Sequence, residues 1–289
     1  MQHPHRNAHR QITLFEDPRN RELRIGIGLD YGTSNSAAAL FDGTRVHLIP
    51  LEPQSWVMPS ATYIDRDYCI STGQEAINRY IESNTGRTVE LSAEVLGEGR
   101  SSTGQIGDHG LPEEADTQKI YGQSLVDGSQ RGRLFRGIKR LLGSAEYQRV
   151  AVFERPFRVV ALITPLLLRM HRAIRQQLTV LSIELADNHA CIGHPVNFEG
   201  TADGRNNTAL QALAEAAGYA EFDRQQFYAE PIAASLSYLH GRSDQSHQLV
   251  LTVDFGGGTL DLCVLRRQGA SFDVIATHGI GLGGDHIDQ

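Results

Sequence analysis

The sequence contains little cysteine, tryptophan or methionine, and it has no long hydrophobic run. Its 289 residues include three cysteines, three methionines and one tryptophan. Because Cys69, Cys191 and Cys263 are far apart and odd in number, they exclude a disulfide framework or a zinc knuckle and favour a reducing compartment. We expect all three to be core residues. The longest nearly apolar run, Val159–Leu168, is too short to span a bilayer.

Positive charge is also scarce. The chain has 27 Lys and Arg against 34 Asp and Glu, which gives a net charge of −7 and argues against a duplex-DNA-binding protein. The first eleven residues carry charge but no apolar stretch behind it, so they do not form a secretory signal. These absences predict a cytoplasmic protein without membrane or nucleic-acid partners.

Apolar patterning predicts alternating strands and helices. A β-meander is expected from Leu23–Leu29, Ser36–Phe41 and Arg45–Leu51, and a second meander from three apolar segments between residues 249 and 276. Helical spacing is found at Val159–Leu181 and Asn206–Gly218, and again at Glu230–Tyr238. Residues 86–132 are rich in Gly, Ser and acidic residues, so we interpret them as an insertion, with regular structure returning at Leu134.

Two loops of similar sequence follow apolar strands near the two ends of the chain. The first is Gly28–Thr33 and the second is Thr252–Thr259. Each contains an Asp, an aromatic residue, glycine and then threonine before the next strand. Two unrelated hairpin turns would use the same residue types. The repetition nevertheless favours two similar lobes whose loops face one cleft.

The residues of these loops suit a bound phosphate. Glycine lets the backbone approach a ligand closely, and successive backbone N–H groups form a concavity that binds anions. Threonine hydroxyls add further donors. An Asp at the end of a strand offers oxygen ligands to Mg²⁺, directly or through water. The paired loops therefore predict a site for the phosphates of a magnesium nucleotide.

Four separated motifs resemble the heat-shock 70 kDa (DnaK-like) chaperones of the actin-like ATPase superfamily. Gly28–Ser36 and Asp254–Asp261 resemble the two phosphate signatures of that family. Lys139–Gly143 is similar to its catalytic-lysine segment, and Ala229–Ser235 to its connecting helix. The resemblance implies an α/β, actin-like ATPase (ribonuclease H-like) fold with two similar lobes, the second of them incomplete.

The resemblance also implies ligands and residue roles. The ligands would be ATP or ADP with Mg²⁺, and K⁺ as a further ion. Lys139 would position the attacking water and the γ-phosphate, and with it Asp30, Asp254 and Glu230 would be catalytic. The three acidic residues would hold Mg²⁺, mostly through water. The remaining nucleotide contacts would come from Gly32, Thr33, Ser34, Asn35, Gly256, Gly257, Gly258, Thr259, Gly283 and Gly284.

The departures from the family pattern resemble the divergent YegD-like branch. They are the insertion near 86–132 and the segment Gly193–Val196, where typical members carry Val-Pro-Ala. Because the chain ends soon after Leu282–Asp288, we expect a fragment or a truncated product. The predicted domains are a flexible tail (1–22), a first-lobe core (23–50 and 157–245), an outer subdomain (51–156) and the start of the second lobe (246–289).

The functional prediction is the ATP-binding and ATP-hydrolysing domain of a DnaK-like chaperone, with client polypeptides or co-chaperones as partners. Two alternatives stay open. An actin-like filament or shape protein would share both loops, and a nucleotide-binding module would bind without hydrolysis.

Overall fold

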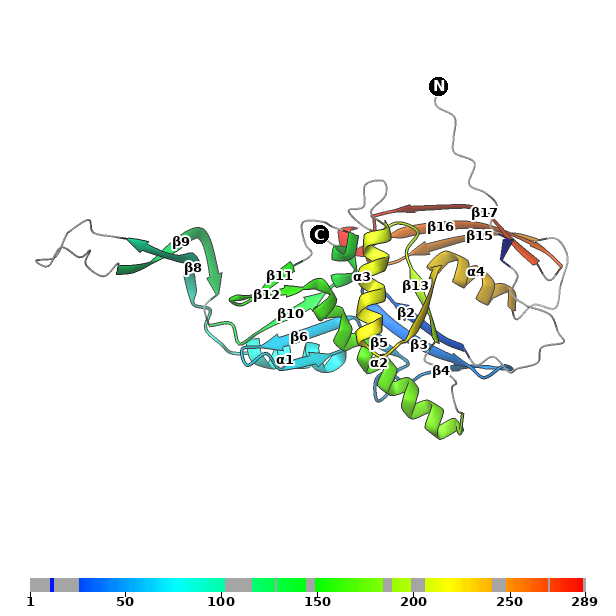
Figure 1. Cartoon of the computed structure of the whole chain (residues 1–289), viewed down its shortest axis with the longest axis horizontal. Helices are drawn as coiled ribbons and strands as arrows, with labels where there is room; N and C mark the ends of the chain where they lie inside the picture. Colours follow the sequence, from blue (N-terminus) through cyan, green and yellow to red (C-terminus); the bar gives the residue numbers. More distant parts are fainter. Residues whose placement is uncertain are drawn as a thin grey trace, which may run out of the picture.

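The chain has a mixed α/β structure with several sheets (Figure 1). The computed structural model describes residues 11–12, 26–101, 116–127, 129–143, 149–183, 189–198, 206–240, 248–269 and 271–287. No helix within these ranges is both long enough and apolar enough to cross a membrane.

The largest sheet combines an N-terminal meander with two later parallel strands. Its strand order is β14-β13-β2-β3-β4, and β5 also pairs with β3. Antiparallel pairing joins β2 to β3 and β3 to β4, as predicted, although β4 is shorter than the expected third strand. The β13 strand lies parallel to both β2 and β14. The strands are β2 (Gly26–Tyr31), β3 (Asn35–Phe41), β4 (Val46–Leu48), β5 (Val57–Pro59), β13 (His189–His194) and β14 (Arg224–Ala229).

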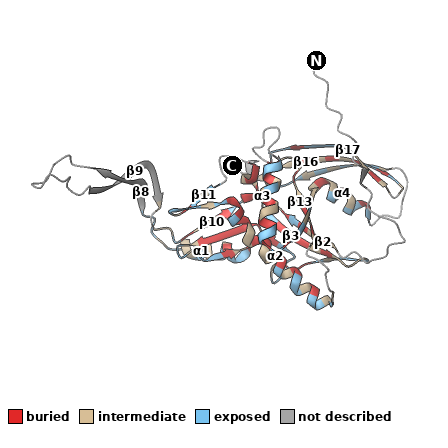
Figure 2. Ribbon diagram, in the orientation of Figure 1, coloured by how far each residue is buried: buried red, intermediate tan, exposed pale blue. Residues whose placement is uncertain are grey.

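Three helices follow the predicted periodicity closely. They are α2 (Val159–Leu181), α3 (Asn206–Tyr219) and α4 (Glu230–His240). The apolar residues that recur every fourth position of α2 are all buried, because this spacing places them on one face of a helix. These residues are Leu162, Leu166, Met170, Ile174 and Leu178. Figure 2 shows the buried residues of α2 and α3 together with those of the large sheet, with which they form the main core.

A second antiparallel meander is built from β15 (Gln248–Phe255), β16 (Leu260–Gln268) and β17 (Ser271–Ile280), as the sequence predicts. Helix α4 packs on one face, with Leu239 against Cys263 and Leu265. The short helix α5 (Gly284–Ile287) follows. The prediction of an irregular tail is wrong at β1 (Gln11–Ile12), which pairs with β17 because a sheet edge offers free backbone groups. Residues 1–10 and 13–22 lie outside the described ranges.

A smaller sheet and a long hairpin complete the structure. The sheet contains β6 (Ala61–Asp65), β7 (Ile70–Thr72) and β10 (Gly132–Arg136), with α1 (Gln74–Asn84) beside it. A 3₁₀ helix, η1 (Ile138–Gly143), comes next, and β11 (Arg149–Val152) pairs with β12 (Arg155–Arg158). The hairpin joins β8 (Leu91–Ser101) to β9 (Asp116–Asp127).

Two expectations about these regions are wrong. Regular structure is already present before Leu134, because β8 and β9 form a hairpin that projects away from the sheets (Figure 1). A ribbon that faces no core does not need alternating apolar residues, so the sequence gives no sign of it. Cys69 is exposed rather than buried, since it lies in the turn after β6, where its N–H donates to Asp65 Oδ1. Cys191 is half-buried and only Cys263 is fully buried.

Candidate functional site

The two predicted loops meet at one place in the structure. The first is the turn between β2 and β3, and the second is the turn between β15 and β16. Gly258 lies so close to Thr33 that a side-chain carbon on this glycine would be 3.0 Å from Thr33 Oγ1. The segment at Gly283 and Gly284 joins them, because the Gly284 N–H donates to the Gly256 carbonyl oxygen over 2.9 Å. Three predicted nucleotide-contacting segments are therefore adjacent.

Ser60 holds the first loop in shape. Its hydroxyl donates to the Gly32 carbonyl oxygen over 2.7 Å, and its backbone N–H donates to the Ser34 carbonyl oxygen over 2.9 Å. The loop is tight enough to require glycine, since a side-chain carbon on Gly32 would meet Asn35 O at 2.2 Å. Thr33 and Ser34 are half-buried and Asn35 is exposed. Nothing in the sequence marks Ser60, because its role depends on the pairing of β5 with β3.

Lys139 is buried within η1 and forms an ion pair with Glu230. Glu230 is the first residue of α4 and keeps 20% of its side chain exposed. Gly193 on β13 leaves room for it, because a side-chain carbon there would lie 3.1 Å from Glu230 Cγ. Residues 91 positions apart in sequence thus form one partly buried charge pair.

Asp30 and Asp254 lie close enough to the Lys139–Glu230 pair to interact with it electrostatically. Asp30 is an exposed residue of β2, yet neighbouring protein atoms partly desolvate its carboxyl group. This desolvation, followed by the negative charge of Glu230, raises the pKa of Asp30 to about 6, although Lys139 opposes the shift. Desolvation and then Glu230 also raise the pKa of Asp254, again against Lys139. The cleft therefore brings together all four predicted catalytic residues.

The neighbouring residues divide into those that face this cleft and those that do not. Arg140 lies between the loops: a side-chain carbon on Gly258 would be 3.2 Å from its Cγ. Arg131 and Arg136 are exposed, whereas Arg133 lies over the Phe135 ring. Arg140 is therefore the arginine of this segment that contacts the loops, although the motifs did not select it as a site residue.

His194 lies at the end of β13, near the charge pair. Burial lowers its pKa, and the charges of Glu230 and Lys139 act on it in opposite directions. Its Nδ1 is 2.7 Å from the Pro195 carbonyl oxygen, and its ring stacks on Phe198. These contacts give His194 a structural role at the end of β13. Asp288, the last residue of the matching segment Leu282–Asp288, lies outside the described residues.

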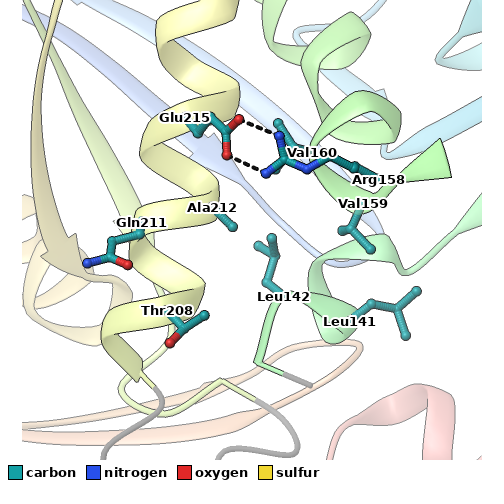
Figure 3. A pocket seen from close by; sticks show the side chains of 9 residues that line it. All are labelled: Leu141, Leu142, Arg158, Val159, Val160, Thr208, Gln211, Ala212 and Glu215. Atoms are coloured by element: carbon teal, nitrogen blue, oxygen red, sulfur yellow. Dashed lines mark hydrogen bonds and ion pairs between the residues drawn. The ribbon is translucent and has the colours of Figure 1, made fainter. Parts of the chain in front are cut away.

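A separate pocket is lined by residues of η1, the start of α2 and α3 (Figure 3). Its apolar floor comes from η1 and the start of α2, and α3 forms the opposite wall. Arg158 and Glu215 close one side through two hydrogen bonds of 2.6 and 2.7 Å. The lining residues are Leu141, Leu142, Arg158, Val159, Val160, Thr208, Gln211, Ala212 and Glu215. None of the predicted catalytic residues lines this pocket.

Carboxylate oxygens of the cleft suit a hydrated Mg²⁺ better than a directly bound one. Hard oxygen ligands are the kind that Mg²⁺ prefers, and this ion usually keeps several of its waters. Among the described residues, no group of three or more Asp, Glu, His or Cys side chains is close enough to coordinate a metal ion directly. Glu230 lies close enough to Asp30 and Asp254 to raise the pKa of both of these carboxyl groups. The donor set therefore fits a metal held mainly through its waters.

The fold and cleft define a mixed α/β protein in which two glycine-containing strand-turn-strand loops converge on a buried Lys–Glu pair. Comparison with known proteins shows which family this protein resembles. Residues 183–289 match the family model described as Hsp70 protein. A chaperone protein HscA homolog of Rickettsia typhi is 24% identical over 285 residues, covering 96% of this chain and 40% of the relative.

Two further relatives agree with this match. A chaperone protein dnaK of Cyanidioschyzon merolae is 26% identical, over 91% of this chain and 37% of the relative. A chaperone protein HscA homolog of Pseudomonas fluorescens is 27% identical, over 95% of this chain and 38% of the relative. The family match over residues 183–289 and these relatives support the Hsp70 resemblance that the motifs predict, and the Hsp70 family implies the actin-like ATPase fold. It spans about 40% of the length of the curated relatives that it matches. The YegD-like branch stays a prediction.

Proposed function

We propose that the chain forms the phosphate-binding part of an Hsp70-type ATPase domain and that ATP or ADP binds between Gly32–Ser34 and Gly256–Thr259. The observation that carries this proposal is the contact between Gly258 and Thr33 beside the Lys139–Glu230 pair. Members of the Hsp70 family bind and hydrolyse ATP, so the similarity to that family supports the same chemistry here. We further propose that the sheets containing β2 and β15 are the cores of two similar lobes.

Backbone N–H groups and hydroxyls of the two loops would bind the phosphates. The half-buried side chains of Thr33, Ser34 and Thr259 are available at the turns, and the glycines keep the walls narrow. Phosphate carries several negative charges, so donors arranged on two sides bind it more strongly than donors on one side. Closing the two loops around the phosphates would also exclude bulk water from them.

Lys139 would stabilise the charge that develops on the transferred phosphoryl group. Phosphoryl transfer depends mainly on positioning and on electrostatic stabilisation. The ion pair with Glu230 orients the Lys139 ammonium group, and burial strengthens its field. Asp254, whose raised pKa brings it closer to neutral pH, would orient the attacking water and accept a hydrogen bond from it.

Asp30, Asp254 and Glu230 would hold the hydration shell of Mg²⁺, as the donor set permits. When bound, this ion would neutralise charge on the phosphates. A site for K⁺ and a cytoplasmic location stay predictions. Chaperone action on client polypeptides, with co-chaperones, is proposed from the relatives, which are chaperones by name.

The proposal is tested by calorimetric titration of the chain with Mg²⁺–pyrophosphate and with Mg²⁺–ADP. Pyrophosphate isolates the loops from any contribution of the nucleoside. We expect both ligands to bind and Gly258→Val to abolish both, because a branched side chain would collide with Thr33 and Arg140. Gly218→Ala is the matched control, since a side-chain carbon at this helical glycine meets nothing within 4 Å.

The outcomes distinguish the alternatives. Binding of both ligands that is lost in Gly258→Val supports the paired-loop site. Absence of binding by wild type at millimolar ligand overturns it. Single-turnover hydrolysis then separates an ATPase from a binding module, and light scattering with ATP at increasing protein concentration would reveal an actin-like filament.

A further inference from the structure

The pocket between η1, α2 and α3 has an apolar interior and one charged side (Figure 3). Its volume is about 190 Å³. Leu142, Val159 and Val160 are buried residues of its lining, and Ala212 on the opposite wall is half-buried. For comparison, an apolar cavity of about 150 Å³ in another protein binds benzene. The pocket is therefore large enough to accept an aliphatic side chain.

The charged side of the pocket is an ion pair that a ligand could replace. Arg158 Nη1 and Nη2 donate to the two carboxylate oxygens of Glu215 over 2.6 and 2.7 Å. The side chains of Arg158 and Glu215 are 55% and 33% exposed. Because water competes with exposed ion pairs, such pairs add little to stability. A ligand that carries both charges can therefore separate this pair without leaving either charge uncompensated.

The two charged groups differ in the ligand group that each would bind. The guanidinium fork of Arg158 matches the geometry of a carboxylate. Arg158 is also the N-cap residue of the 23-residue helix α2, and the positive end of a helix favours a negative charge. Glu215 accepts hydrogen bonds and would bind an ammonium group. The pocket thus places partners for a carboxylate and an ammonium side by side, next to an apolar cavity.

We propose that this pocket binds a free α-amino acid with an aliphatic side chain. The carboxylate of the ligand would pair with Arg158 and its ammonium group with Glu215. Its side chain would lie against Leu142, Val159 and Val160. The site does not depend on the proposed function, because none of the predicted catalytic residues lines the pocket.

The end of a polypeptide shares half of this chemistry. A C-terminal residue offers a carboxylate without an ammonium group, and an N-terminal residue offers an ammonium group without a carboxylate. The Arg158–Glu215 pair needs both charges if neither of its members is to lose a partner. A free amino acid therefore fits the pocket better than either end of a peptide.

The test is a titration of the chain with L-leucine, followed by NMR of the methyl groups of Leu142, Val159 and Val160. We expect saturable shifts of these signals at low-millimolar L-leucine, since a ligand of so few atoms binds modestly. N-acetyl-L-leucine imitates a C-terminal residue and L-leucinamide an N-terminal one. Each should bind roughly tenfold more weakly, because one charge-assisted interaction is lost. Glycine keeps both charges but has no side chain, so it should cause no saturable shift.

Three variants test the residues of the pocket. Ala212→Leu fills the apolar interior and should abolish binding of L-leucine. Ala214→Leu is the matched control, since Ala214 lies on the same helix and is also half-buried but does not line the pocket. Glu215→Gln should weaken L-leucine roughly tenfold and leave N-acetyl-L-leucine bound no more weakly than by wild type. A general loss of structure would weaken both ligands.

Two results would overturn the proposal without any variant. One is the absence of a saturable methyl shift in wild type at tens of millimolar L-leucine. The other is equal affinity of wild type for L-leucine and N-acetyl-L-leucine, since the ammonium group and Glu215 would then be irrelevant. Because these titrations contain no nucleotide or pyrophosphate, either result would leave the proposed function standing. Failure of pyrophosphate to bind would likewise leave the test of this pocket valid.

Discussion

We predict that the substitution Lys139→Met, which removes the buried cation of the cleft, destabilises the fold. Lys139 is the residue that lowers the pKa values of both Asp30 and Asp254, and it pairs with Glu230. Methionine preserves the side-chain length but leaves the three carboxylates without this cation. Removing one partner of a fully buried pair costs about 3–5 kcal/mol. Because Glu230 is 20% exposed, we expect a smaller loss, about 2–3 kcal/mol in the free energy of unfolding at pH 8.

The same charges determine how the destabilisation by Lys139→Met depends on pH. Without Lys139, the pKa of Asp30 rises above its present value of about 6. Protonation near pH 5 then relieves the repulsion, so the destabilisation should be smaller at pH 5 than at pH 8. Urea unfolding followed by circular dichroism at pH 5 and pH 8 measures the free energy of unfolding of both proteins. Glu230→Gln on the Lys139→Met background should recover part of the loss. A loss below about 0.5 kcal/mol that is equal at both pH values would refute the charge cluster.

Three other predictions follow from the cleft and the hairpin. Affinity for Mg²⁺–ADP, measured by calorimetric titration, should fall as the pH drops below about 6, by up to about tenfold per pH unit, because a proton on Asp30 competes with the ion. Asp30→Asn should flatten this dependence of affinity on pH. Ser60→Ala should lower the melting temperature and weaken pyrophosphate binding, because the first loop loses the hydroxyl that donates to the Gly32 carbonyl oxygen. The control Ser55→Ala, at an exposed turn, should alter pyrophosphate binding little. Replacing residues 91–127 by a short turn should leave pyrophosphate affinity within about twofold, because the hairpin projects away from the loops, and a larger loss would show that it contributes to the site.

The elements that face a core could be predicted from the sequence. Helix α2 begins and ends where its periodicity predicts, because a helix buried on one face must repeat its apolar residues. The two meanders also follow their apolar alternation. The β8–β9 hairpin could not be predicted, since a ribbon without a core lacks that alternation. The pairing of Gln11–Ile12 with β17 depends on a distant edge that a local pattern does not reveal.

The site shows the same division between local and long-range information. Motif resemblance selected Asp30, Lys139, Glu230 and Asp254, and the structure brings these four residues together. It did not select Ser60, whose hydrogen bond to Gly32 spans 28 positions, or the link from Val196 to Asp261, which spans 65. Serine and aspartate are too common for such contacts to be found without the fold.

A crystal structure of this chain with Mg²⁺–ADP would test the central claim most directly. The account predicts diphosphate density between Gly32–Ser34 and Gly256–Thr259, with the Lys139 ammonium group directed toward the place of a γ-phosphate. Diphosphate bound elsewhere, or an empty cleft in crystals grown with saturating Mg²⁺–ADP, would contradict it.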